Sequence, residues 1–200
     1  MKTKESISMI IKNIQKHIAT HDELNILISG GTSPKKILNY FNNYSLKWEK
    51  VNIMLSDERL LDKNSSESNE KNLKINLIKN KSKSVNYIDI NNFVLPDNFD
   101  IGILGFGEDG HIASIFNKHI KSKKLMSQTA KREILKIEPI GQPCVARITV
   151  NMSVLLKIKH IYLISNSKNK TEIFKRAKND PAMPLHRLLK IHKKIQFIEV

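Results

Sequence analysis

With 200 residues the chain is long enough to bury a core without disulfides or metals, so we expect residues 1–200 to form a single domain. Cys144 is the single cysteine, so no intramolecular disulfide can form. No apolar run reaches the roughly 20 residues of a membrane span, and none has the pattern of the apolar core of a signal peptide. We therefore expect a cytoplasmic protein with no membrane partner. The net charge of +15 would suit a nucleic-acid-binding protein, but only five of the 34 basic residues are arginine and the lysines are scattered without interleaved aromatics, so we expect no nucleic-acid partner.

The chain alternates between helical and strand patterns. Isoleucines at helical spacing predict an amphipathic helix over residues 4–19. Further helices are expected to open at Pro34, to begin near Gly110 or His111, and to cover residues 69–79, 154–156, 171–178 and 185–191. Short apolar runs predict strands at residues 24–28, 51–55, 85–88, 100–104, 134–137, 147–150, 160–164 and 195–198, with a polar loop at 56–68.

Strands that alternate with helices predict an α/β protein. We expect a mostly parallel sheet covered on both faces, which is a Rossmann-like three-layer αβα sandwich in a single domain. Ligands of such sheets bind at the carboxyl ends of the strands. Three polar loops are expected to meet there, at residues 29–34, 56–59 and 105–111.

The loop after the 100–104 strand carries the residues best suited to catalysis. It reads Gly-Phe-Gly-Glu-Asp-Gly-His-Ile-Ala-Ser over residues 105–114, and its glycines let the backbone turn sharply and approach a ligand. His111 has a side chain whose ordinary pKa lies near neutrality, which suits it to accept and return a proton. Asp109 could orient the imidazole or touch the substrate.

The other two loops supply groups that favour an anion. Ser-Gly-Gly-Thr-Ser-Pro at residues 29–34 opens a helix with free N–H groups that can hold a phosphate, although a tight turn with Ser33 capping the helix is at least as good an interpretation. Ser-Asp-Glu-Arg at 56–59 brings carboxylates and a guanidinium to the same edge, where such clusters are often solvated ion pairs. Arg147 and Lys170 lie at strand–helix junctions and are either surface cations or phosphate contacts. No paired His or Cys spacing indicates a metal, so none is expected.

Together these loops resemble the 6-phosphogluconolactonase family, within the wider group that includes glucosamine-6-phosphate deaminase. The resemblance covers nearly the whole chain, and five motifs occur in the family's order. They are Ser-Gly-Gly-Thr-Ser-Pro (29–34), Ser-Asp-Glu-Arg (56–59, with Ser68-Asn69 downstream), the 105–114 loop, Ala-Arg-Ile-Thr (146–149) and Pro-Leu-His-Arg-Leu-Leu (184–189). The resemblance implies hydrolysis of 6-phospho-D-glucono-1,5-lactone to 6-phosphogluconate in the oxidative pentose phosphate pathway. The implied partner is a small phosphorylated sugar lactone, no cofactor is expected, and we expect a monomer or a weak homodimer.

The resemblance also implies roles for particular residues. His111 would act as the general base that activates water, Asp109 would orient its imidazole, and Arg59 would steady the oxyanion or contact the phosphate. The implied substrate and phosphate ligands are Gly30, Gly31, Thr32, Ser33, Asp57, Arg147 and Lys170, with Lys168 as an alternative to Lys170.

Two other functions are consistent with the same pattern. The first is a glucosamine-6-phosphate deaminase or an aldose–ketose isomerase on the same fold. Deaminases of the group carry a glutamate five residues beyond the histidine, where this chain has Phe116, and a tyrosine after Asp-Glu, where it has Arg59. These two departures favour the lactonase. The second alternative is a non-catalytic binder of sugar phosphate or nucleic acid.

Overall fold

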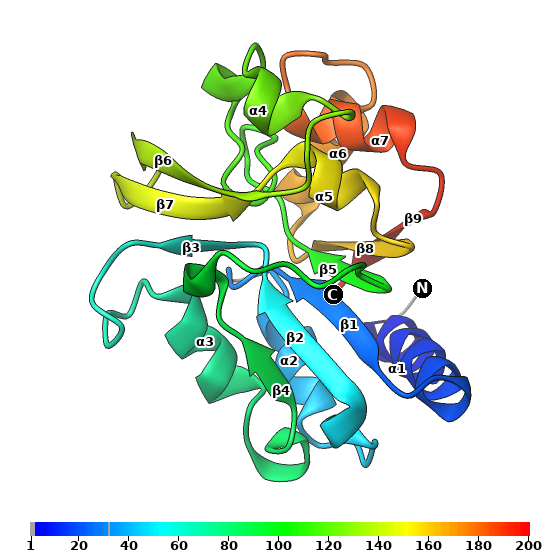
Figure 1. The fold of residues 1–200 in the computed structure, drawn as a ribbon. Coiled ribbons are helices and arrows are strands. Elements are labelled where there is room, and N and C mark those ends of the chain that lie inside the picture. The colour runs from blue at the N-terminus through cyan, green and yellow to red at the C-terminus, as the bar shows by residue number, and fades with distance from the viewer. Residues whose placement is uncertain (1–2, 32) are drawn as a thin grey trace.

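A computed structural model describes residues 3–31 and 33–200. Its middle layer is a six-stranded parallel sheet with the strand order β4-β2-β1-β5-β8-β9 (Figure 1). The strands are β1 (Leu24–Ile28), β2 (Val51–Leu55), β4 (Asn86–Ile88), β5 (Ile101–Leu104), β8 (His160–Ser165) and β9 (Ile195–Glu199). The predicted α/β class and mostly parallel sheet are therefore confirmed.

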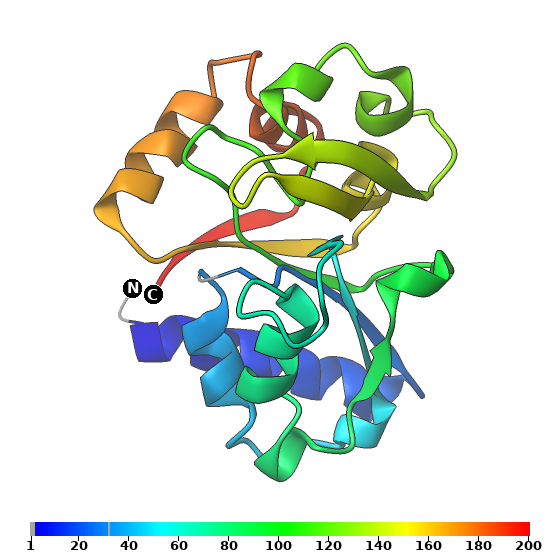
Figure 2. The same ribbon diagram turned by 90° about the vertical axis from the view of Figure 1, so that its left-hand side faces the viewer.

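Helices cover both faces of this sheet, as Figures 1 and 2 show. One face carries α1 (Thr3–Thr20), α2 (Lys35–Phe41) and α3 (Asn69–Asn76), and the other carries α4 (Lys123–Met126), α5 (Met152–Leu156), α6 (Lys168–Ala177) and α7 (Pro184–Ile191). Short 3-10 helices are η1 (Trp48–Lys50), η2 (Asn80–Ser82), η3 (Ile90–Asn92) and η4 (Asn117–His119). The result is the expected three-layer sandwich.

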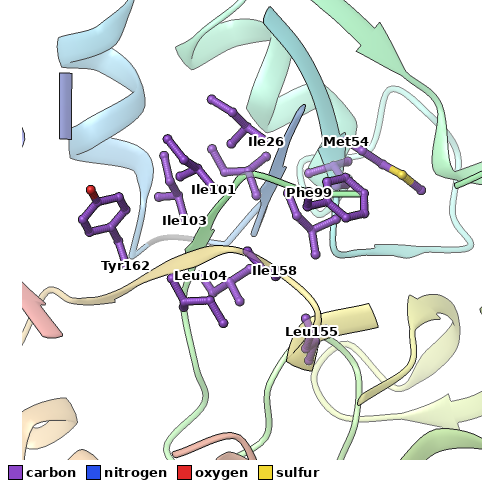
Figure 3. Packing of buried hydrophobic residues seen from close by; sticks show 14 of the residues in the cluster. Ile26, Met54, Phe99, Ile101, Ile103, Leu104, Leu155, Ile158 and Tyr162 are labelled. Carbon is purple, nitrogen blue, oxygen red and sulfur yellow. The ribbon is translucent and has the colours of Figure 1, made fainter. Parts of the chain in front are cut away.

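The core explains why the central strands are continuous apolar runs. Every residue of β1 and β5 is buried, because helices lie above and below them. Figure 3 shows Ile103 and Leu104, neighbours on β5, on opposite sides of the sheet. Ile103 lies on the side of Tyr162, and Leu104 lies on the side of Leu155. The helical isoleucines of α1 are also buried, which confirms the amphipathic pattern; they are Ile7, Ile10, Ile11, Ile14 and Ile18.

A second, antiparallel sheet was not anticipated. It has the order β3-β7-β6 and consists of β3 (Asp57–Arg59), β7 (Val145–Val150) and β6 (Ile134–Ile140). The strand β3 lies in the segment predicted as a polar loop. Three polar residues show no strand periodicity of their own, and β3 exists because it pairs with β7, about ninety positions later in the chain.

One predicted helix is wrong. The segment that begins near Gly110 and His111 forms no helix, but a turn in which Ile112 bridges to Phe106 and Ile115. Ala113 has φ +49, a left-handed conformation that ends any right-handed helix. The local sequence is compatible with either structure, and contacts with the second sheet, described below, select the turn.

Candidate active site

A cavity of about 390 Å³ opens where β1 and β5 end, and all three polar loops line it. The chain leaves β1 toward α2 on one face and leaves β5 toward the other face, so the cavity lies at the switch point where such sheets bind ligands. Its volume is within the usual range for small-molecule sites. The expected site residues that line it are Gly30, Gly31, Ser33, Asp57, Arg59, His111, Arg147 and Lys170. Thr32 lies outside the described residues, and Asp109 belongs to the site through its contact with His111.

The imidazole of His111 is held by Asp109. Its Nδ1 lies 2.6 Å from Asp109 Oδ1, which also accepts the His111 main-chain N–H at 3.1 Å. A carboxylate only accepts hydrogen bonds, so Nδ1 is the nitrogen that donates to Asp109, and in the neutral form of the ring Nε2 is an acceptor. Burial works to raise the pKa of Asp109, but the hydrogen bonds from His111, and the positive charge of its ring when protonated, outweigh burial and lower that pKa. The pair therefore has the tautomer that a general base requires.

Two further residues fix the plane of this imidazole. The ring of Phe116 packs against it with centroids 4.4 Å apart and planes tilted by 33°. On the backbone side, a Cβ at Gly107 would lie 2.0 Å from His111 Cε1, so only glycine leaves room for the ring. The His111 side chain keeps 30% of its surface exposed, which leaves it reachable by water and substrate.

Lys170 joins the loop after β1 to the loop after β5. Its Nζ donates to Ser33 Oγ at 2.6 Å and to the Phe106 carbonyl at 2.7 Å. Burial lowers the pKa of Lys170, although Glu108 opposes this shift. Ser33 does not cap α2, whose N-cap residue is Pro34 and has no side-chain hydrogen bond. The structure thus brings Lys170 to the predicted phosphate loop, whereas Lys168 is exposed at the start of α6 and does not line the cavity.

Arg59 and Arg147 are cross-strand partners on β3 and β7. Arg147 is 3% exposed and donates to the carbonyls of Ile140 and Pro143 at 3.0 and 3.1 Å. Arg59 donates to the Glu67 carbonyl at 2.6 Å, and in the part of the chain that the structure describes its buried Nε has no hydrogen-bond partner. Burial and the charge of Arg59 together lower the pKa of Arg147. Two guanidinium groups side by side at a cavity favour a bound anion that would separate their charges.

Asn69 is a cavity residue that sequence reasoning did not select as a site residue. It is 2% exposed, its Nδ2 donates to the Asp57 carbonyl at 2.9 Å, and its buried Oδ1 has no partner within residues 3–31 and 33–200. Its side chain lies directly on Gly30, where an added Cβ would be 2.3 Å from Asn69 Cβ. The only signal in the sequence was its place in the Ser68-Asn69 pair, because neither helix periodicity nor charge marks it.

Glu58 has a structural task beside the cavity rather than in its lining. Its carboxylate accepts the main-chain N–H groups of Arg59, Asn69 and Glu70 at 2.7, 2.8 and 2.6 Å. Burial raises the pKa of Glu58 despite these hydrogen bonds. The carboxylate therefore fixes the start of α3, and with it the position of Asn69.

The described residues contain no cluster of three or more His, Cys, Asp or Glu side chains suited to a metal ion. Within the same ranges, 3–31 and 33–200, no helix is long and apolar enough to cross a membrane.

Comparisons with known proteins agree with the five motifs. A family model described as Glucosamine-6-phosphate isomerases/6-phosphogluconolactonase matches residues 3–94 and 90–197. A 6-phosphogluconolactonase of Thermotoga maritima is 25% identical over 211 residues, covering 96% of this chain and 91% of that protein. One from Helicobacter pylori is 26% identical over 190 residues, covering 84% and 80%.

Solved structures show the same fold. The crystal structure of 6-phosphogluconolactonase from Thermotoga maritima superimposes with a TM-score of 0.81 at 24% identity, over 99% of this chain and 95% of that one. A putative 6-phosphogluconolactonase from Neisseria gonorrhoeae gives a TM-score of 0.82 at 22% identity, over 98% and 94%.

Proposed function

The chain belongs to the family of glucosamine-6-phosphate isomerases and 6-phosphogluconolactonases, and we propose that it hydrolyses 6-phospho-D-glucono-1,5-lactone to 6-phosphogluconate. The observation that carries this choice is the geometry of His111. The imidazole of His111, whose Nδ1 is bonded to Asp109, lines the same cavity as Lys170 and the loop at Gly30, Gly31 and Ser33, which leaves Nε2 as the nitrogen that can take a proton. The names of the relatives support the same activity.

The phosphate would be held at the start of α2. Main-chain N–H groups of Gly30, Gly31 and Ser33 and the ammonium of Lys170 offer donors there, and Arg147 adds a second positive charge at the cavity. Thr32 is part of this proposed cradle by its place in the sequence. Asp57 also lines the cavity, but its carboxylate would repel a phosphate, so we place it away from the phosphate group.

His111 would then carry the chemistry. Its Nε2 removes a proton from water as the water oxygen attacks the C1 carbonyl of the lactone, and the resulting imidazolium protonates the ring oxygen when the C1–O bond breaks. Asp109 stabilises the imidazolium, since it already accepts from Nδ1. A positioned base of this kind contributes about 100- to 10,000-fold to the rate.

Arg59 is the proposed donor for the tetrahedral oxyanion. Arg59 lines the cavity beside Arg147, and its buried Nε has no hydrogen-bond partner among the described residues. A donor aimed at a developing oxyanion is worth about 3 to 4 kcal/mol. Contact of Arg59 with the phosphate is the alternative. We further propose that the protein acts in the cytoplasm, as a single domain and as a monomer or weak homodimer, without a cofactor and without a nucleic-acid partner.

The deaminase alternative uses the same cavity with a different base arrangement. Where deaminases of the group carry a glutamate, Phe116 packs its ring on His111, so the imidazole meets an apolar surface there. We therefore expect no ammonia release from glucosamine 6-phosphate.

The test is acid release from freshly prepared 6-phosphogluconolactone, followed in a pH-stat or with an indicator dye against the spontaneous rate. The proposal expects acceleration that is proportional to protein concentration. A rate equal to the blank would refute it, and ammonia release from glucosamine 6-phosphate under the same conditions would favour the deaminase instead.

A further inference from the structure

The carboxylate of Asp57 is bonded to the loop that carries His111. Its Oδ2 accepts the Ser114 hydroxyl at 2.6 Å, and its Oδ1 accepts the Ser56 hydroxyl at 3.0 Å. Asp57 is 7% exposed and Ser114 is fully buried. A short hydrogen bond to a buried charged acceptor is among the stronger ones in proteins, so it ties the loop after β5 firmly to β3.

Ser114 is held from a second side by the neighbouring strand. Its main-chain N–H donates to Thr149 Oγ1 at 3.1 Å, and Thr149 is itself fully buried on β7. Asp57 and Thr149 are paired residues in the β3–β7 register. One pair of strand neighbours therefore fixes both the side chain and the main chain of the same serine.

This anchor follows directly on a strained residue. Ala113 has φ +49, a conformation that is unfavourable for alanine and persists only where the surroundings hold it. Two residues before it, the His111 carbonyl accepts the Gly107 N–H at 2.9 Å. The turn that presents His111 is thus closed by Gly107 at one end and by the bonds of Ser114 at the other.

We infer that Asp57 is a positioning residue, which through Ser114 holds the strained turn and so places His111 in the cavity, and that it does not bind the substrate. Two observations favour this over a direct role. Both carboxylate oxygens already accept hydroxyl groups of the protein, and a carboxylate at a cavity lined by Arg59, Arg147 and Lys170 would oppose the anion that these cations favour. The inference uses the proposed lactonase activity only as a kinetic readout.

The chain offers a matched pair of variants, because two serines donate to the same carboxylate. Ser114→Ala removes the donor that lies in the His111 turn, and Ser56→Ala removes a donor outside that turn, whose hydroxyl otherwise contacts Ser29 Oγ at 3.3 Å. We expect Ser114→Ala to lower kcat about 10-fold or more, the range of a hydrogen bond to a charged group, with KM little changed. Ser56→Ala is expected to keep a kcat close to that of the wild type.

Asp57→Asn keeps the size of the side chain and completes a double-mutant cycle with Ser114→Ala. If Asp57 acts through Ser114, the double variant loses no more kcat than the more damaged single variant. Losses that multiply, or a raised KM in Asp57→Asn, would overturn the inference, because they would give Asp57 a role independent of Ser114. Equal losses in Ser56→Ala and Ser114→Ala would also overturn it, because the bond to the His111 turn would then have no special effect. Thermal unfolding of every variant excludes loss of the fold as the cause.

An NMR measurement separates this inference from the proposed function. The imidazole nitrogen signals of His111, in protein labelled with ¹⁵N-histidine, should shift or split in Ser114→Ala and stay unchanged in Ser56→Ala. If the wild type fails to hydrolyse the lactone, the proposed function fails while this signal still decides the positioning role. An unchanged His111 signal in both Ser114→Ala and Asp57→Asn would overturn it.

Discussion

Replacement of Gly30 by alanine should destabilise the protein, whereas replacement of Gly31 should not. A Cβ at Gly30 would lie 2.3 Å from Asn69 Cβ and 2.8 Å from Asn69 Cα, while one at Gly31 would meet none of the described residues within 4 Å. Carbon atoms in contact are normally about 3.5 to 4.0 Å apart, so either the loop or the start of α3 must move by more than about 1 Å. The backbone atom of Asn69 cannot turn aside as a flexible side chain would.

The size of the effect follows from overpacking. Such insertions into well-packed regions cost about 1 to 3 kcal/mol. For a chain of this length each kcal/mol lowers Tm by about 2 to 4 °C, so Gly30→Ala should lower Tm by about 2 to 12 °C.

The assay is thermal and urea unfolding of wild type, Gly30→Ala and Gly31→Ala, followed by circular dichroism. Gly31→Ala should unfold within error of the wild type. Equal stability of all three proteins would show that Asn69 does not lie against Gly30 as described, and the placement of α3 at the cavity would then be wrong.

Three other changes have definite expected outcomes. His111 lowers the pKa of Asp109 although burial works against this shift, so the wild type should be more stable than Asp109→Asn at neutral pH. This difference in the free energy of unfolding should vanish as the pH falls through the lowered pKa, which urea unfolding from about pH 7 to 3 will measure. A difference that stays constant over this range would contradict the prediction. Lys170→Met should raise KM for the lactone about 10- to 100-fold, which is the range of a charged hydrogen bond. Lys168→Met changes an exposed residue outside the cavity and should leave KM unchanged. Equal KM values for the two variants would contradict the assignment of Lys170 to the phosphate. Phe116→Leu removes the ring packed on His111 and should lower kcat about 2- to 10-fold, which is the range of an aromatic contact. An unchanged kcat would argue against a role for that ring.

The parallel sheet was predictable because each of its central strands has a recognisable local sequence pattern. Buried on both faces, β1 and β5 need apolar residues at every position, and the glycines that follow them mark their ends. The isoleucines of α1 show the helical period for the same reason, since only one face of that helix meets the core. Once the sheet is parallel, its polar loops must meet at one edge, and the cavity is found there.

The second sheet was not predictable, because its existence depends on pairing between distant segments. Nothing local in Asp57–Arg59 distinguishes a short strand from a polar loop, and its partner is β7. The turn after His111 also depends on the second sheet, because Asp57 of β3 and Thr149 of β7 hydrogen-bond to Ser114. A local reading of this segment therefore gave a helix where tertiary contacts impose a turn.

Asn69 shows the same limit at the site itself. The sequence placed Gly30 in a phosphate loop, where a glycine is expected in any case, and gave no reason to look for a side chain lying against it. The close approach arises because Glu58 fixes the first turn of α3. Contacts of this kind connect three segments and leave no periodic pattern in any of them.

The role of His111 is the central claim, and one comparison tests it directly. Lactone hydrolysis by His111→Ala should fall by about 100- to 10,000-fold in its acceleration over the spontaneous rate, while calorimetry shows that the variant still binds 6-phosphogluconate with nearly the affinity of the wild type. That result is expected because the proposed phosphate contacts, Lys170 and the loop at Gly30, are independent of the imidazole. A variant that hydrolyses the lactone as fast as the wild type would contradict the account.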